Sequence, residues 1–230
     1  MKSRSLVLVL ATAAALAVTS VHGTSMADAA PAAPAAPTAA SVVANVQTFY
    51  NATTTFSADF TQTYLVKAYN QTKTSQGHVI FSKPGKMDWT YKDPAGNRIV
   101  SDGTLLRVYE AANKQMYEQN VTQSQYPAAL AFLTGQGELA KLFNFQLLDG
   151  ATMQFPGGWV LVGDPVTPTP AYTKVLFYVD QATSQVRRVL ILDGQGNRNR
   201  FDFAAPVVNQ PVPATQFVFT PPAGTTIVKP

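Results

Sequence analysis

The stretch Phe-Ser-Ala-Asp-Phe-Thr-Gln-Thr (56–63), followed later by Ser-Lys-Pro-Gly-Lys-Met-Asp-Trp-Thr-Tyr (82–91), decides the fold. Side chains alternate between the two sides of a β-strand, so the first segment places one set on one side: Phe56, Ala58, Phe60, Gln62, Tyr64 and Val66. The second segment places Met87, Trp89 and Tyr91 together, opposite Asp88 and Thr90. Both segments are typical of strands with one apolar, aromatic side and one polar side. The function is therefore argued from a sheltered apolar surface.

The amino-terminal residues predict export. Residues 1–4 form a short basic segment, and residues 6–18 form an apolar run of signal-peptide length that is too short to span a bilayer comfortably. Ala27 and Ala29 fit a cleavage site, so cleavage after Ala29 is favoured over cleavage near Gly23. We expect residues 1–29 to be a cleaved signal peptide and the protein to work in an exported compartment, most simply a bacterial periplasm.

Composition narrows the class of protein further. The chain has 0 cysteines, which excludes disulfides, thiol catalysis and the acylated cysteine that anchors bacterial lipoproteins. Residues 30–40 are rich in Ala and Pro and are predicted to be a disordered linker. Residues 41–230 have the size of one domain. The formal net charge of +4 is a mild excess and does not indicate a nucleic-acid partner.

Most of the domain is predicted to be β-structure. A helix is expected from an N-cap at Ser41, with Val42, Val46 and Phe49 on one face. Strands are predicted over residues 56–67, 77–82, 87–91, 98–102, 105–110, 115–120, 145–148, 158–163, 174–179, 185–193, 198–203 and 217–219. Two helical segments, 127–134 and 138–143, interrupt the strands. Because short turns require antiparallel neighbours, the pattern predicts one curved antiparallel sheet of about eleven strands, with helices covering its concave face.

Several short motifs resemble functional patterns without their structural context. Residues 135–140 match the letters of a dinucleotide-binding loop but lack the βαβ unit that such a loop needs. His78 is the one histidine of the domain, and no cysteine or carboxylate cluster accompanies it in sequence. Asp59 and Asp88 lie on the polar sides of their strands, where we expect solvated carboxylates. No catalytic residue, metal ligand or cofactor is predicted.

Motifs spread along the whole domain resemble those of one known family. They are residues 56–63, the turn and strand from Lys83 to Trp89, residues 99–103 and the ending 219–224. In this order they resemble the LolA family of periplasmic outer-membrane lipoprotein carriers. Residues 127–143 are similar to the helical segment of that family, and the similarity extends over residues 41–228.

The resemblance implies a fold and a function. The fold would be mainly β with α: an unclosed antiparallel β-barrel under a helical lid, with a hydrophobic cavity between them. The protein would be a monomeric, non-enzymatic chaperone for acylated lipoproteins. It would receive them from an ATP-driven transporter of the inner membrane and pass them to an outer-membrane acceptor.

The predicted cavity residues are apolar side chains from the inner side of the sheet and from the two helical segments. From the sheet they are Phe56, Phe60, Tyr64, Phe81, Met87, Trp89, Tyr91, Leu106 and Val108. From the helical segments they are Leu130, Phe132, Leu133, Leu139, Leu142 and Phe143. The alternative is that these same residues form an ordinary packed core.

Two positions depart from the family pattern. Lys83 stands where the family has an arginine that ties the lid closed, and Met87 stands where phenylalanine is common. Lysine offers a mobile point charge instead of a planar fork of donors, so we expect a weaker or differently placed lid latch at Lys83. The flexible thioether of Met87 stays compatible with varied acyl chains.

Two other functions remain open. The same fold could carry a glycolipid, or sense stray lipoproteins for a stress response. A hydrolase of cell-envelope material would instead use Asp59 and Asp88 as a carboxylate pair.

Overall fold

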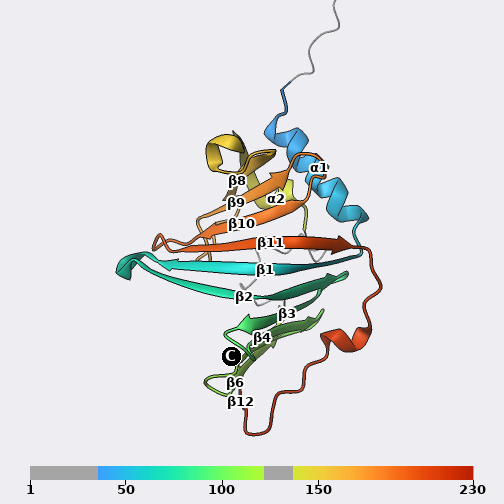
Figure 1. The fold of residues 1–230 in the computed structure, drawn as a ribbon, viewed down its shortest axis with the longest axis vertical. Coiled ribbons are helices and arrows are strands. Elements are labelled where there is room, and N and C mark those ends of the chain that lie inside the picture. The colour runs from blue at the N-terminus through green and yellow to red at the C-terminus, as the bar shows by residue number, and fades with distance from the viewer. Residues whose placement is uncertain (1–35, 122–136, 230) are drawn as a thin grey trace, which may run out of the picture. The chain divides into compact units, whose positions relative to one another are not determined.

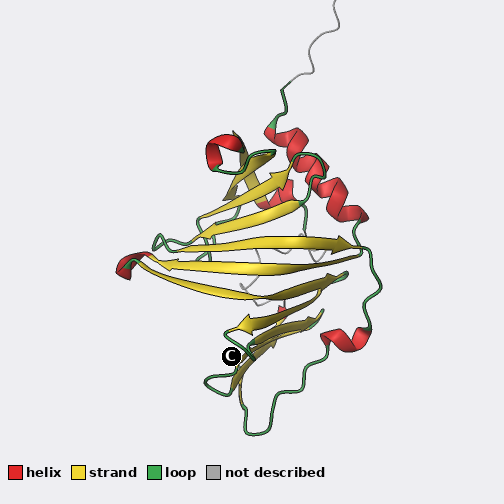
Figure 2. Cartoon of the chain, in the orientation of Figure 1, coloured by secondary structure: helices red, strands yellow, loops and turns green. Residues whose placement is uncertain are grey.

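One twelve-stranded sheet dominates the computed structural model, which describes residues 36–121 and 137–229 (Figure 1). Its first six strands are β1 (Thr55–Val66), β2 (Gln71–Ser82), β3 (Lys86–Asp93), β4 (Arg98–Asp102), β5 (Leu105–Glu110) and β6 (Gln115–Asn120). The others are β7 (Phe143–Asp149), β8 (Gly158–Pro165), β9 (Lys174–Asp180), β10 (Val186–Leu192), β11 (Arg198–Val208) and β12 (Thr226–Val228). The two α-helices of the described chain are α1 (Ala39–Ala52) and α2 (Leu139–Leu142) (Figure 2).

The strand order shows how the sheet is assembled. It runs β12-β6-β5-β4-β3-β2-β1-β11-β10-β9-β8-β7. Two antiparallel meanders are joined where β1 pairs with β11, with Phe60 opposite Phe203. The one parallel pair in the order is β12 with β6, which sets Ile227 opposite Met116. Because β12 and β7 are the two ends of the order, the sheet is unclosed and mostly antiparallel, which confirms the predicted fold class.

Helix α1 begins earlier than its sequence suggested. Thr38 is the N-cap: its hydroxyl accepts a hydrogen bond from the Ser41 amide, and the Ser41 hydroxyl accepts one from the Thr38 amide. The predicted N-cap at Ser41 is therefore wrong, because Ser41 is the third helical residue of a capping box. Ala39 and Ala40, which were predicted to belong to the linker, are helical. The predictions for residues 1–35 and for the helix 127–134 lie outside the described residues.

Two further boundaries differ from the prediction. The predicted helical segment 138–143 ends at Leu142, and Phe143 begins β7, because Phe143, Phe145 and Leu147 alternate on the inner side of the sheet. The predicted strand 217–219 is wrong: Phe217 ends a 3₁₀ helix (Ala214–Phe217), and β12 is the last strand. The nearby prolines lack the N–H that a central strand needs, so this segment does not join the sheet.

One apolar cluster occupies the inner side of the sheet. It contains Phe56 from β1, Trp89 from β3, Phe177 from β9 and Val46 from α1, each at most 2% exposed. Strands β3 and β9 are separated by several others in the strand order, so a shared core requires the sheet to curve around it. Helix α1 closes one side of this core. Within the described chain, no helix has the length and apolarity needed to cross a membrane.

Residues 209–228, the C-terminal strap, cover the opposite side of β3–β5. Figure 1 shows this red segment leaving β11 and returning along the lower part of the sheet to β12. Phe217 is buried within it, and the ring of Phe219 lies 5.5 Å from the ring of Tyr109 on β5. The guanidinium of Arg98 lies over the Phe219 ring at 5.2 Å. Part of the outer side of the sheet is thus buried as well as the inner side.

Candidate apolar binding site

The inner side of β1, β2, β3 and β11 carries an aromatic wall, made of Phe56, Phe60, Phe81, Trp89, Phe201 and Phe203. Trp89 is at its centre: its ring centroid lies 4.9 Å from that of Phe60, 5.2 Å from Phe201 and 5.8 Å from Phe81. All three pairs meet edge to face, an arrangement that aromatic quadrupoles favour. The wall is thus one continuous apolar layer contributed by four strands, and each of its six side chains is at most 4% exposed.

A glycine on β2 makes the wall continuous. Gly77 pairs with Phe60 on one side and Tyr91 on the other. A Cβ atom at Gly77 would come within 2.7 Å of the Phe60 ring and 2.2 Å of the carbonyl oxygen of Thr90. The missing side chain therefore lets Phe60 lie across β2 and reach Trp89 on β3.

Most of the predicted cavity residues lie on this inner side. Those that are buried in the core, at most 2% exposed, are Phe56, Phe60, Phe81, Met87, Trp89, Leu106, Leu139 and Phe143. Those that are half-buried and pack against it are Tyr91, Val108 and Leu142. Tyr64 is half-buried further along β1. Leu130, Phe132 and Leu133 lie outside the described residues.

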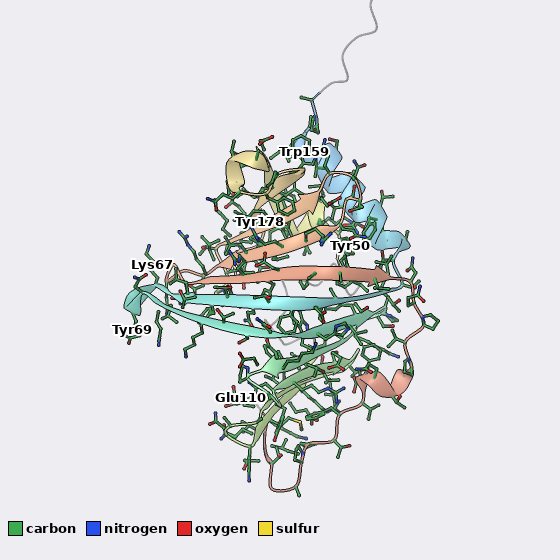
Figure 3. All side chains as sticks on the ribbon, in the orientation of Figure 1. Tyr50, Lys67, Tyr69, Glu110, Trp159 and Tyr178 are labelled. Carbon is green, nitrogen blue, oxygen red and sulfur yellow. The ribbon has the colours of Figure 1, made fainter. Side chains whose placement is uncertain are left out.

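The inner side of the sheet becomes polar beyond the aromatic wall, toward the β1–β2 hairpin. The Tyr91 hydroxyl donates a hydrogen bond to Gln62 Oε1 at 3.0 Å, and Gln62 Nε2 donates to Asn199 Oδ1 at 2.9 Å. Beyond them, Lys67 and Tyr69 stand at the tip of the hairpin, where Tyr69 is 82% exposed (Figure 3). Polar side chains thus bound the apolar surface at this end.

Helix α1 contributes side chains that were not predicted for the site. Val42, Val43, Val46 and Tyr50 are buried against the inner side of the sheet. The hydroxyl of Tyr50, a residue labelled in Figure 3, accepts a hydrogen bond from the Val186 amide at 3.2 Å. Burial raises the pKa of this phenol. The helical spacing of Val42 and Val46 was visible in the sequence, but spacing alone does not indicate which surface a helix covers.

Lys83 holds the carboxyl end of α1. Its Nζ donates a hydrogen bond to the carbonyl oxygen of Tyr50, and its main-chain amide donates to the carbonyl oxygen of Thr54 at 2.9 Å. A cation at the carboxyl end of a helix also interacts favourably with the helix dipole. Partial burial lowers the pKa of the Lys83 ammonium. The described contact of the predicted latch residue is thus with α1.

A hollow of about 330 Å³ opens between α1 and β7. Its walls are Ala39, Ala40, Val43, Ala44 and Gln47 of α1 together with Ala140, Phe143, Asn144 and Phe145. Its volume falls within the range of about 300–1,000 Å³ that is typical of ligand pockets. Of the predicted cavity residues, Phe143 alone lines it within the described chain.

The two carboxylates that a hydrolase would use have separate roles. Asp88 is 1% exposed, and it accepts hydrogen bonds from Arg98 Nε at 3.0 Å and Nη2 at 2.8 Å, and from Gln216 Nε2 of the strap. The prediction that Asp88 is solvated is therefore wrong, because the C-terminal strap covers it. Asp59 is exposed and lies 2.9 Å from His78 Nδ1 and 3.8 Å from Lys92 Nζ.

The fold and the site define a protein built around one apolar side of an unclosed sheet. The chain belongs to the LolA family: the family described as outer membrane lipoprotein carrier protein LolA matches residues 51–220. This is a family of carrier proteins and not of enzymes, so the resemblance seen in the sequence is confirmed.

Individual relatives carry the same description as the family. The chain is 28% identical over 190 residues to the outer-membrane lipoprotein carrier protein of Nitrosomonas europaea, covering 83% of this chain and 90% of that protein. It is 29% identical over 190 residues to the protein of the same description from Nitrosospira multiformis, covering 82% and 89%. A solved structure of an uncharacterized conserved protein from Thermus thermophilus shares the fold, with a TM-score of 0.52 at 13% identity over 84% of this chain and 99% of that one.

Proposed function

We propose that the protein is a periplasmic chaperone that binds the acyl chains of lipoproteins against its aromatic wall and carries them from the inner to the outer membrane. The observation that carries this proposal is the continuous apolar inner side of the sheet, in a chain that belongs to the lipoprotein carrier family. Residues 1–29 act as the cleaved export signal. The partners are acylated lipoproteins, an ATP-driven transporter that releases them and an acceptor in the outer membrane.

The physical need for such a protein follows from the cost of exposing acyl chains to water. Each buried methylene contributes ~0.8 kcal/mol, so a chain of about fifteen carbons represents roughly 12 kcal/mol. A lipoprotein with several such chains does not cross an aqueous compartment unaided. The aromatic wall and the hollow beside α1 supply apolar surface for these chains, while Gln62 and Asn199 mark a polar boundary.

Native mass spectrometry of the protein purified from its host compartment tests the proposal. We expect a complex whose extra mass belongs to an acylated polypeptide. A free glycolipid in its place would favour a glycolipid carrier on the same fold and contradict the lipoprotein proposal.

A charge placed on the aromatic wall tests the site. Phe60→Asp should abolish binding of a dipalmitoyl lipopeptide, because the new carboxylate would lie among aromatic rings. The matched control is Thr63→Asp, which puts the same group on the outer side of the same strand, opposite Arg200. Equal binding by both folded variants would place the lipid elsewhere.

A further inference from the structure

The indole N–H of Trp89 is a buried donor without an acceptor. Trp89 is 1% exposed, and its Nε1 has no hydrogen-bond partner among the described residues. Buried tryptophans usually satisfy this group, because an unpaired donor in an apolar interior costs stability. Such an exception at the centre of a candidate binding surface requires a reason.

The surroundings of Trp89 explain why the donor is unpaired. Its neighbours in the aromatic wall are the rings of Phe60, Phe81, Phe201 and Phe203, with centroids at 4.9 to 6.2 Å. A phenyl ring has no lone-pair oxygen. Main-chain carbonyls of β3 are engaged with β2 on one side and β4 on the other. A bridging water would need two to four polar partners, which phenyl rings do not provide.

The acceptor that this donor lacks is a group that an esterified acyl chain carries. The hydrocarbon of a lipid is apolar throughout, but each ester-linked chain carries a carbonyl oxygen at its head. Trp89 is the only residue of the aromatic wall whose side chain carries an N–H or O–H group, because the other five are phenylalanines. A lipid lying along the wall would contact phenyl rings with its methylenes, and Trp89 would supply one directional contact.

We propose that Trp89 Nε1–H donates a hydrogen bond to the ester carbonyl oxygen of a bound acyl chain. The protein then recognises the linkage of the chain as well as its hydrocarbon. This inference rests on the proposed function, since it requires that lipid binds at the aromatic wall.

Paired probes test this hydrogen bond. One probe is a lipopeptide with two ester-linked palmitoyl chains, and the other is its ether-linked dialkyl counterpart, which lacks the carbonyl oxygens. We expect the wild-type protein to prefer the ester by about three- to tenfold, the value of one neutral hydrogen bond. Trp89→Phe should bind both probes with similar affinity. Phe81→Leu, which removes one ring beside Trp89 and keeps the indole N–H, should weaken both and retain the preference.

A spectroscopic measurement does not depend on the variants binding well. The chain contains two tryptophans, Trp89 and Trp159, so ¹⁵N-labelled protein should give two indole signals, assigned by the one lost in Trp89→Phe. The ester probe should move the Trp89 indole proton downfield, and the ether probe should move it less.

The outcomes separate the two proposals. If the wild-type protein binds neither probe, the carrier function itself is wrong. If it binds both equally and the Trp89 indole proton moves to the same extent with each, the carrier function stands and the hydrogen bond is wrong. A preference for the ester that Trp89→Phe retains would also overturn the assignment to Trp89.

Discussion

Lys83 Nζ donates a hydrogen bond to the carbonyl oxygen of Tyr50, so the turn between β2 and β3 fastens the carboxyl end of α1 to the sheet. Tyr50 is in turn held from the other side by the Val186 amide on β10. One residue of α1 thus bridges two distant parts of the sheet. The contact with Lys83 is the partly exposed one of the two, and it is the one that substitution can remove without opening the core.

Replacement of Lys83 by leucine should slow the release of cargo while leaving the fold intact. If the proposed function holds, the Lys83 ammonium stabilises the lipid-free protein through its bond to Tyr50, and its loss makes the return to that state after release less favourable. We expect release of a dipalmitoyl lipopeptide to phosphatidylcholine vesicles to slow by about three- to tenfold, in line with one hydrogen bond. Lys83→Arg keeps a donor and serves as the control. Normal transfer by Lys83→Leu would show that this contact does not regulate release.

Loss of the Asp88 carboxylate should destabilise the protein strongly. Asp88→Ala leaves Arg98 and Gln216 facing a buried site without an acceptor, and breaking a buried ion pair costs about 3–5 kcal/mol. Chemical denaturation measures this change in the free energy of unfolding. Asp59→Ala, which removes an exposed carboxylate, should change the free energy of unfolding far less. Similar effects from both substitutions would show that the strap does not protect Asp88.

A methyl group at Gly77 should disrupt the aromatic wall. Gly77→Ala places a Cβ atom 2.2 Å from the Thr90 carbonyl oxygen, so β2 or β3 must shift, at a cost of about 1–3 kcal/mol. Thermal unfolding should show a lower midpoint, and the fluorescence of Trp89 should change. At Gly194 the nearest atom to an added Cβ is 3.9 Å away, so Gly194→Ala is the control. A Gly77→Ala protein as stable as this control would contradict the packing of Phe60 over β2.

The attachment of the C-terminal strap should weaken in acid. Glu118 on β6 lies 3.1 Å from Lys229 Nζ and accepts a hydrogen bond from Arg107 Nε at 3.0 Å. The bond from Lys229, followed by that from Arg107, holds the pKa of Glu118 below its ordinary value of 4.5. Because the folded-state pKa is lowered, this stabilisation is complete above the ordinary value and is lost as the pH falls through the folded-state pKa.

Amide hydrogen exchange in β12 measures this effect. Protection of residues 226–228 should decrease in the wild-type protein as the pH is lowered below 4.5. Glu118→Gln provides the reference at each pH, because its side chain does not titrate. Parallel curves for the two proteins would show that Glu118 does not hold the strap.

The inner side of the sheet was predictable from sequence because its signal is local. Alternation in residues 56–66 and 87–91 predicts that Phe56, Phe60 and Trp89 face the apolar side of their strands, and all three are buried together. The burial of Asp88 could not be predicted in the same way. It depends on Gln216, which lies 128 positions away in sequence, and on a strap whose prolines follow no strand or helix period.

The surface that α1 covers could not be predicted from the sequence pattern either. The spacing of Val42 and Val46 predicts an apolar helix face but does not identify its partner. Two hydrogen bonds of Tyr50, one to Lys83 and one to Val186, hold α1 against the sheet, and both partners are distant in sequence. A lysine before a turn proline is an ambiguous signal, because its flexible side chain can reach several carbonyl groups.

The short strand β12 has a consequence for the protein at high concentration. An unclosed sheet has two rows of free main-chain donors and acceptors, and such rows invite other chains to add on and polymerise. By lying parallel to Gln115–Tyr117, the three residues of β12 occupy part of the row on β6. Residues 226–228 thus cover part of one edge of the sheet and leave fewer main-chain groups there for another chain to pair with.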